Sequence, residues 1–196
     1  MLSLIRPALV LTFIFTALTG LAYPFAMTGL AQALMPYQAN GSLTVQNGKV
    51  VGSDLIGQAF TTERYFHGRP SATSTADPND AAKTVDAPYN AASSSGSNLG
   101  ATSKALAEAI RDRAAVYGQG PAPADLVTAS ASGLDPQISP ASALIQVPRV
   151  AAARGIAAER IAQLVQDHVE KRNLGFLGEP RVNVLALNLA LDTLRP

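Results

Sequence analysis

The sequence predicts an α+β domain, richer in helix than in strand and with a short β-hairpin, behind one N-terminal transmembrane helix. Three observations lead to this fold class. The chain starts with a long uncharged apolar run, and a hairpin pattern follows it. The second half of the chain then carries capped segments whose apolar residues recur at helical spacing.

The apolar run covers residues 8–35 and contains no Asp, Glu, Lys, Arg or His. As a helix it would span about 42 Å at about 1.5 Å per residue, more than the roughly 30 Å apolar thickness of a bilayer. Pro7 and Pro36 flank the run, at positions where helices begin and end. We therefore predict three parts: a cytoplasmic N-terminus over 1–7, a transmembrane helix over 8–35 and one exported domain over 37–196.

The orientation depends on Arg6, the one side-chain cation before the run, because short basic segments stay in the cytoplasm. A cleaved signal peptide is the competing interpretation, since Ala31 and Ala33 resemble a small-residue cleavage site. Cleavable apolar regions usually reach about 15 residues, and this run is nearly twice that length. The length favours a retained anchor surrounded by membrane lipid.

Small and polar residues recur at intervals of four inside the run: Thr12, Thr16, Gly20, Pro24, Thr28 and Gln32. Residues four apart lie near one helix face, so we predict that this polar stripe packs against a partner helix. Gln32 needs a hydrogen-bonding partner that lipid cannot supply, and Pro24 leaves the carbonyl of Gly20 unpaired, which predicts a kink. The alternative is that a lone membrane helix tolerates these residues.

Composition limits the function of the predicted exported domain. Without Arg6, the chain's 15 basic residues become 14, equal to its 14 acidic residues, so nothing indicates nucleic acid as a partner. The chain has no Cys, which excludes disulfides and thiolate metal sites. It also has no Trp and few aromatic residues, so we expect an aliphatic core.

The exported domain begins with a predicted β-hairpin. Residues 42–46 alternate toward Asn47 and Gly48, a pair that favours the positive φ angles of a tight turn, and residues 49–51 continue the pattern. Phe60, Tyr65 and Phe66 then form an aromatic cluster, which we interpret as a core anchor.

Residues 67–101 are rich in Ser, Ala, Asn, Asp, Pro and Gly and show neither helical nor strand periodicity. Loops of this length inside compact domains are usually functional or disordered. Residues 93–97 alone would indicate a flexible linker, whereas Arg69 and Tyr89 are residues that flexible linkers seldom need.

Helices are predicted on both sides of a turn-rich connector at 130–140. Thr102 or Ser103 caps a helix that ends near Gly118, and residues 126–128 are a candidate short strand. Residues 139–154 form a second helix, with Ser139 as its cap, a kink or break at Pro148, and Gly155 as its stop.

A third helix makes a helical hairpin with the second. Its apolar face is formed by Ile161, Leu164, Val165 and Val169. Asn183 caps a last helix with Leu187, Leu191 and Leu194 at helical spacing, and a buried strand at its start is the alternative.

No motif in the sequence indicates catalysis. His67 and His168 have no second ligand at metal-binding spacing, and neither a G-x-S-x-G elbow nor an S-x-x-K motif is present. The glycines of 96–100 with Lys104 resemble a phosphate loop only weakly, because the G-K-[ST] ending is missing. On its residues alone, the chain is a binding or structural module and not an enzyme, without a metal site.

Several segments together resemble the C subunit of the bacterial Kdp-type potassium-transporting ATPase. They are Gly57-Gln58 with Phe60, YFHGRPSA at 65–72, YNA at 89–91, SSGSNLG at 94–100, SASGLDP at 130–136, ISP at 138–140 and GFLGEPRVNVL at 175–185. The resemblance covers almost the whole chain, in order. Gln137 and Pro148 depart from the family pattern.

The resemblance implies an accessory, non-catalytic subunit of a high-affinity, ATP-driven potassium importer in the bacterial inner membrane. Its partners would be a P-type ATPase subunit and a channel-like potassium-binding subunit. The chain has no Asp-Lys-Thr-Gly motif and no selectivity-filter sequence, so it is expected to assemble and tune the complex. No cofactor is assigned to the chain itself, and ATP is expected to act through the complex.

We expect the predicted exported domain to lie over the channel-like subunit, with Arg69, Asn90, Ser95 and Asn98 as candidate partner contacts. The alternative is that these groups only tie the loop to its own domain. A rival function, which the family's description as a catalytic chaperone suggests, is that the domain binds ATP and raises the ATP affinity of the pump subunit. An unrelated anchored structural protein is the third interpretation.

Overall fold

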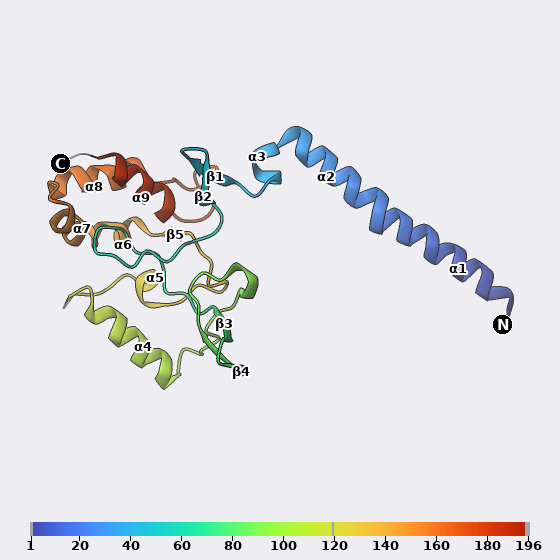
Figure 1. Ribbon diagram of the computed structural model, residues 1–196, viewed down its shortest axis with the longest axis horizontal. Helices are drawn as coiled ribbons and strands as arrows, with labels where there is room; N and C mark the ends of the chain where they lie inside the picture. Colours follow the sequence, from blue (N-terminus) through green and yellow to red (C-terminus); the bar gives the residue numbers. More distant parts are fainter. Residues whose placement is uncertain (1, 119, 195–196) are drawn as a thin grey trace. The chain divides into compact units, whose positions relative to one another are not determined.

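The computed structural model describes residues 2–118 and 120–194 and divides into two compact units, Met1–Val51 and Gly52–Pro196 (Figure 1). The first unit holds α1 (Leu2–Ala17), a π-helical turn (Leu18–Ala22), α2 (Tyr23–Leu34), α3 (Pro36–Ala39), β1 (Leu43–Gln46) and most of β2 (Lys49–Ser53). The predicted helix-rich α+β class, with one N-terminal apolar helix, is confirmed.

The N-terminal helix begins earlier than predicted. It starts at Leu2, and Pro7 lies inside α1. Its ring removes the hydrogen bond to the carbonyl of Ser3 and crowds that carbonyl, which weakens the second turn of the helix. The continuous helix from Ser3 to Leu34 is long and apolar enough to cross a membrane, and it ends before Pro36 as predicted.

A kink was predicted at Pro24, and the structure has a π-helical turn, Leu18–Ala22, one residue before it. The N–H of Tyr23 donates to the carbonyl of Leu18. This wider turn makes room for the proline ring and absorbs the missing N–H of Pro24 without ending the helix.

The predicted β-hairpin is confirmed. β1 and β2 pair as a two-stranded sheet, and the turn residues Asn47 and Gly48 have φ values of 51° and 75°. Positive φ at both positions is the geometry of a tight hairpin turn, which Asn and Gly adopt at low cost.

The second unit contains a hairpin where the sequence predicted only a loop. Its strands β3 (Ser74–Asp77) and β4 (Asp80–Asp86) pair antiparallel, with Thr75 opposite Val85 and an irregularity between Ala76 and Asp77. A 3-10 turn (Ala91–Ser93) follows, and the side chain of Asn90 caps it. Residues 67–101 are therefore partly regular, although the sequence showed no strand periodicity there.

The predicted helix caps are confirmed. Ser103, Ser139 and Asn183 each accept a backbone N–H from the first turn of a helix. The helices of this unit are α4 (Lys104–Ala115), α5 (Ala124–Val127), α6 (Pro140–Leu144), α7 (Val147–Arg154), α8 (Ala158–Asp167) and α9 (Val184–Thr193).

One detail of this region differs from the predictions. The candidate strand at 126–128 is wrong, because Leu126 and Val127 close the single helical turn α5 and bury their side chains. The break predicted at Pro148 is confirmed: the helical segment after Ser139 is divided into α6 and α7, and Pro148 lies in the first turn of α7, where a proline costs least. Gly155, at φ 66°, ends α7.

The core lies where α6, α7, α8 and α9 pack together (Figure 1). Strands β5 (Gln137–Ile138) and β6 (Val182–Asn183) pair antiparallel at its edge. Both predicted alternatives for the start of α9 are therefore present, since β6 is a short buried strand and its last residue, Asn183, caps the helix. Phe66 is the one aromatic side chain among the buried core residues of the described chain, and the others are aliphatic, as predicted.

Candidate interaction site

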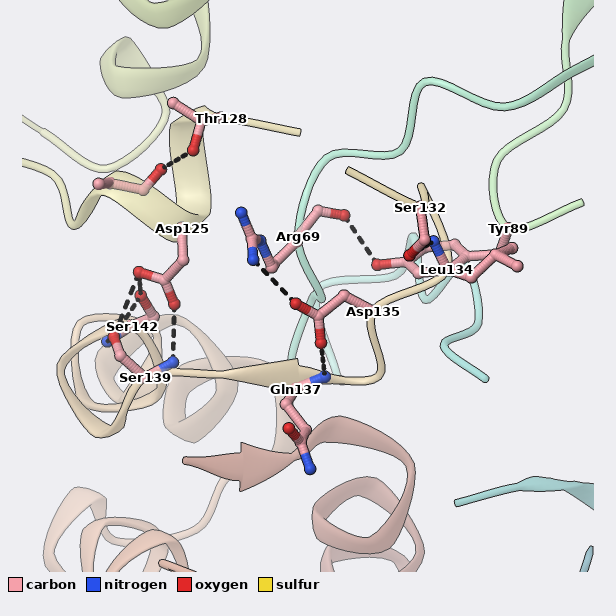
Figure 2. Close-up of polar contacts among 11 residues, drawn as sticks. Arg69, Tyr89, Asp125, Thr128, Ser132, Leu134, Asp135, Gln137, Ser139 and Ser142 are labelled. Carbon is pink, nitrogen blue, oxygen red and sulfur yellow. Dashed lines mark hydrogen bonds and ion pairs between the residues drawn. The ribbon is translucent and has the colours of Figure 1, made fainter. Parts of the chain in front are cut away.

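The candidate site lies where the segment that starts at His67 meets residues 130–137. Arg69 Nη1 donates to Asp135 Oδ2 at 2.8 Å, and the backbone N–H of Gln137 donates to Asp135 Oδ1 at 3.0 Å (Figure 2). The carboxylate is thus fixed from both sides. The two side chains are 24% and 29% exposed, so this ion pair is only partly open to water.

Tyr89 holds the other end of Arg69. Its hydroxyl donates to the carbonyl of Arg69 at 2.7 Å, as Figure 2 shows. Burial raises the pKa of Tyr89 to about 12, and the charge of Asp135 adds to this shift. The phenol therefore stays protonated and keeps donating across the physiological pH range.

Hydroxyl and amide groups tie the long loop to itself and to residues 130–137. Ser71 Oγ donates to the carbonyl of Gly133 at 2.7 Å and accepts the N–H of Tyr89 at 3.0 Å. Thr73 Oγ1 donates to the carbonyl of Ala87 at 2.6 Å and accepts the N–H of Asn90 at 3.1 Å. The hydroxyl groups of Ser71 and Thr73 therefore tie the loop together by hydrogen bonds within its own unit.

Glycines permit this close packing. A Cβ at Gly57 would lie 2.7 Å from the carbonyl oxygen of Asp135 and would also clash with the ring of Tyr89. Gly133 combines a φ of 67° with a Cβ position 2.6 Å from the carbonyl oxygen of Ser95. Larger residues at either position would push the loop away from residues 130–137.

Asp125 connects the site to the helical core. Its carboxylate accepts the backbone N–H of Ser139 at 2.7 Å and the hydroxyl of Ser142 at 2.6 Å (Figure 2). Burial alone would raise the pKa of Asp125, but these hydrogen bonds outweigh that effect and hold the pKa below its usual value. Asp125 therefore acts as an ionised anchor for the start of α6.

Three clefts border Arg69. The first, of about 440 Å³, lies between Arg69, Tyr89, Arg113, Val116 and Tyr117. Two others, of about 300 and 580 Å³, flank Asp135. Within the described residues, Arg69 Nε is the one buried side-chain polar atom without a hydrogen-bond partner. Arg69 thus borders three clefts, while its unpaired Nε is itself shielded from solvent.

Two buried amides, which sequence reasoning did not identify, hold the neighbouring backbone. Asn188 exchanges two hydrogen bonds with Phe66, and Gln146 does the same with His67. Burial lowers the pKa of His67, against the raising effect of its hydrogen bond to the carbonyl of Thr62. Helical spacing could have placed Asn188 on the buried face of α9 with Leu191, but not its partner 122 positions away.

The four predicted contact residues are not equivalent. Arg69 lines the clefts, whereas Asn90 is used internally, since its Nδ2 donates to Ser74 and its Oδ1 accepts from Ala92. Ser95 pairs through its backbone N–H with the carbonyl of Ser132 at 3.0 Å. Asn98 is exposed and has a φ of 53°.

The six residues of the polar stripe lie along α1, the π-helical turn and α2, and all are exposed within the unit Met1–Val51. One expectation is corrected here. The amide of Gln32 does not need another protein for a partner, because it exchanges hydrogen bonds of 3.2 and 3.1 Å with the amide of Asn40.

Comparison with known proteins matches nearly the whole chain to one family. The family model described as "KdpC: K+-transporting ATPase, c chain" matches residues 5–193. The chain is 63% identical to a potassium-transporting ATPase KdpC subunit of Rhodopseudomonas palustris and 62% identical to one of Bradyrhizobium diazoefficiens, in both cases over 98% of each chain. A KdpC subunit of Methylorubrum extorquens is 61% identical over 97% of each chain. The chain therefore belongs to the KdpC family of potassium-transporting ATPase subunits.

Proposed function

We propose that this chain is an accessory, non-catalytic subunit that assembles and stabilises a potassium-importing ATPase and tunes its potassium uptake. Its relatives are named as subunits of such an ATPase, and a subunit requires partners. The partners we propose are the P-type ATPase subunit and the channel-like potassium-binding subunit, in the bacterial inner membrane. The domain over 37–196 would lie outside the cytoplasm.

The observation that carries this proposal is Arg69. Its ion pair with Asp135 forms within the chain, its side chain is still 24% exposed, and three clefts border it. A partly exposed guanidinium, with more N–H donors than the one that Asp135 uses, suits a partner that adds a carbonyl or carboxylate without refolding the loop. We propose that the surface around Arg69 and the exposed Asn98 docks on the channel-like subunit.

The anchor supports docking within the membrane. In a regular α-helix each step of four residues advances by about 40°, so a stripe from Thr12 to Gln32 would turn through roughly 200°. The π-helical turn adds one residue to a turn and cancels roughly 100° of this drift. The stripe therefore stays on about one side of the helix, where a partner helix can cover it.

A conservative substitution tests whether the surface around Arg69 takes part in assembly. Arg69→Lys keeps the charge beside Asp135 but removes Nε and the planar fork. We expect lower co-purification of the other Kdp subunits and weaker apparent potassium affinity, with unchanged thermal unfolding of the full chain. Arg172→Lys is the matched control, because Arg172 pairs with Glu179 on an exposed segment. Normal assembly and transport with Arg69→Lys would contradict the proposal.

Direct nucleotide binding remains the second candidate because the first cleft, at about 440 Å³, has the size of small-molecule sites and offers Tyr89, Tyr117 and Arg113. Gly96 does not add to it, because its backbone packs against that of Ala131: a Cβ at Gly96 would lie 2.8 Å from the carbonyl oxygen of Ala131. Equilibrium binding of labelled ATP to the full chain in detergent distinguishes the two functions. Saturable binding that Arg113→Ala abolishes would favour the chaperone function.

A further inference from the structure

The hairpin β1–β2 is amphipathic. Alternate residues of a strand share a face, so Leu43 and Val45 lie together, and the two-residue turn places Val50 opposite Val45. These three side chains are 45%, 59% and 60% exposed. The other face carries Thr44, Gln46 and Lys49, and the half-buried Val51 lies at its base. Near its turn, the ribbon therefore has one apolar and one polar face that remain open within the unit Met1–Val51.

The hairpin is held beside the end of the apolar helix. The amides of Gln32, in the last turns of α2, and Asn40 exchange two hydrogen bonds, and Asn40 Nδ2 also donates to the carbonyl of Pro36 at 2.7 Å. The backbone N–H of Ser42 donates to the carbonyl of Tyr37 at 3.0 Å, and the hydroxyl of Tyr37 donates back to the carbonyl of Ser42 at 3.2 Å. β1 thus starts from an elbow that is tied to the helix.

We propose that the apolar face of this hairpin, Leu43, Val45 and Val50, lies in the lipid leaflet from which α2 emerges, at the boundary of headgroups and acyl chains. This rests on the membrane anchoring in the proposed function. If α1 and α2 span the bilayer, the elbow keeps the hairpin at the membrane surface. The lipid of that leaflet is then the apolar environment next to the apolar face of the hairpin.

The residues around the apolar face suit this location. Tyr37 lies in the elbow, and tyrosine is enriched where a membrane meets water. Lys49 lies on the polar face, where its ammonium can meet headgroup phosphates at the membrane surface.

The absence of Cys from the chain allows a site-specific test. Val45→Cys and Gln46→Cys, neighbours on opposite faces, are labelled with the environment-sensitive fluorophore NBD in the full chain and reconstituted in phosphatidylcholine–phosphatidylglycerol vesicles. The label at position 45 is expected to emit at shorter wavelength, to be quenched by lipids brominated near the headgroup, and to resist aqueous iodide. The label at position 46 should show the opposite.

Two further measurements separate the alternatives. A label at Phe13→Cys must be quenched by lipid that is brominated deep in the acyl chains. If this label were not quenched, the membrane anchoring itself would be rejected, and not only the proposed position of the hairpin. Asn40→Ala should reduce lipid quenching at position 45 because it releases the elbow. Equal iodide access at positions 45 and 46 would overturn the proposal. Shielding of position 45 only after the other Kdp subunits are added would also overturn it, in favour of a protein contact.

Discussion

Asn188 and Phe66, 122 positions apart, are joined by two hydrogen bonds of 2.9 Å, from the backbone N–H of Phe66 to Asn188 Oδ1 and from Asn188 Nδ2 to the carbonyl of Phe66. Both residues are buried. The amide thus takes the place of a neighbouring strand and fixes the segment that leads into Arg69. Because this pairing lies between the core and the candidate site, its loss should affect both.

Asn188→Leu is expected to lower the free energy of unfolding by about 3 kcal/mol, since two buried backbone groups lose their partners at about 1–3 kcal/mol each and the added apolar contacts return part of the cost. Urea unfolding of the full chain in detergent measures it. Gln166→Ala, on the exposed side of α8, is the control and should change little. A loss no larger than that of the control would mean that the backbone of Phe66 finds other partners.

Gly133→Ala should destabilise the chain by about 1–3 kcal/mol, because it combines a positive φ with a Cβ placed 2.6 Å from the carbonyl oxygen of Ser95. Gly100→Ala is the matched control, since no atom lies within 4 Å of its Cβ position and its φ is ordinary. Limited proteolysis should cut residues 67–101 faster in Gly133→Ala alone. Equal cutting of both variants would show that the loop does not depend on this contact.

The helices were predictable because their signals are local. Ser103, Ser139 and Asn183 precede apolar periodicity, and Gly155 follows it, so caps and stops could be located from neighbouring residues. The turn of β1–β2 was predictable for the same reason.

The hairpin β3–β4 was missed because its strands carry Ser, Ala, Asp and Lys, which have low strand propensity, although Pro78 and Asn79 between two Asp residues are a turn signal. At the candidate site, Arg69 was identified but its partner was not. The distance of 66 positions between Arg69 and Asp135 leaves no periodicity to detect, and only the fold brings them together.

The ion pair itself can be measured with a double-mutant cycle of Arg69→Met and Asp135→Asn. Each single variant leaves the other charge half-buried, so the two single losses should exceed the loss in the double variant by a coupling energy of about 1 kcal/mol. The same cycle on the exposed pair of Lys104 and Glu108 should give a smaller value. Coupling energies equal within error would show that partial burial adds nothing to the Arg69–Asp135 pair.

The lowered pKa of Asp125 predicts that the stability of the fold depends on pH. Its folded-state pKa lies below the ordinary value of 3.8, so its contribution to stability is present in full above that value and is lost as the pH falls through the lower folded-state pKa. Asp125→Asn should therefore be less stable than the wild type at pH 7, and the difference should shrink below about pH 4. Thermal unfolding between pH 2 and pH 7 tests this. A difference that persists unchanged at the lowest pH would assign the effect to packing and not to the carboxylate charge.

Pro24 connects the shape of the anchor to assembly. Pro24→Ala restores an N–H that can donate to the carbonyl of Gly20, which favours a regular α-helix over the π-helical turn Leu18–Ala22. The stripe residues on the two sides of that turn would then rotate roughly 100° out of line. We expect the variant to insert normally but to co-purify less of the other Kdp subunits. Phe25→Ala is the control, because its position in α2 is adjacent to the stripe and not part of it. If Pro24→Ala assembled like the control, the alignment of the stripe would not be what the partner helix recognises.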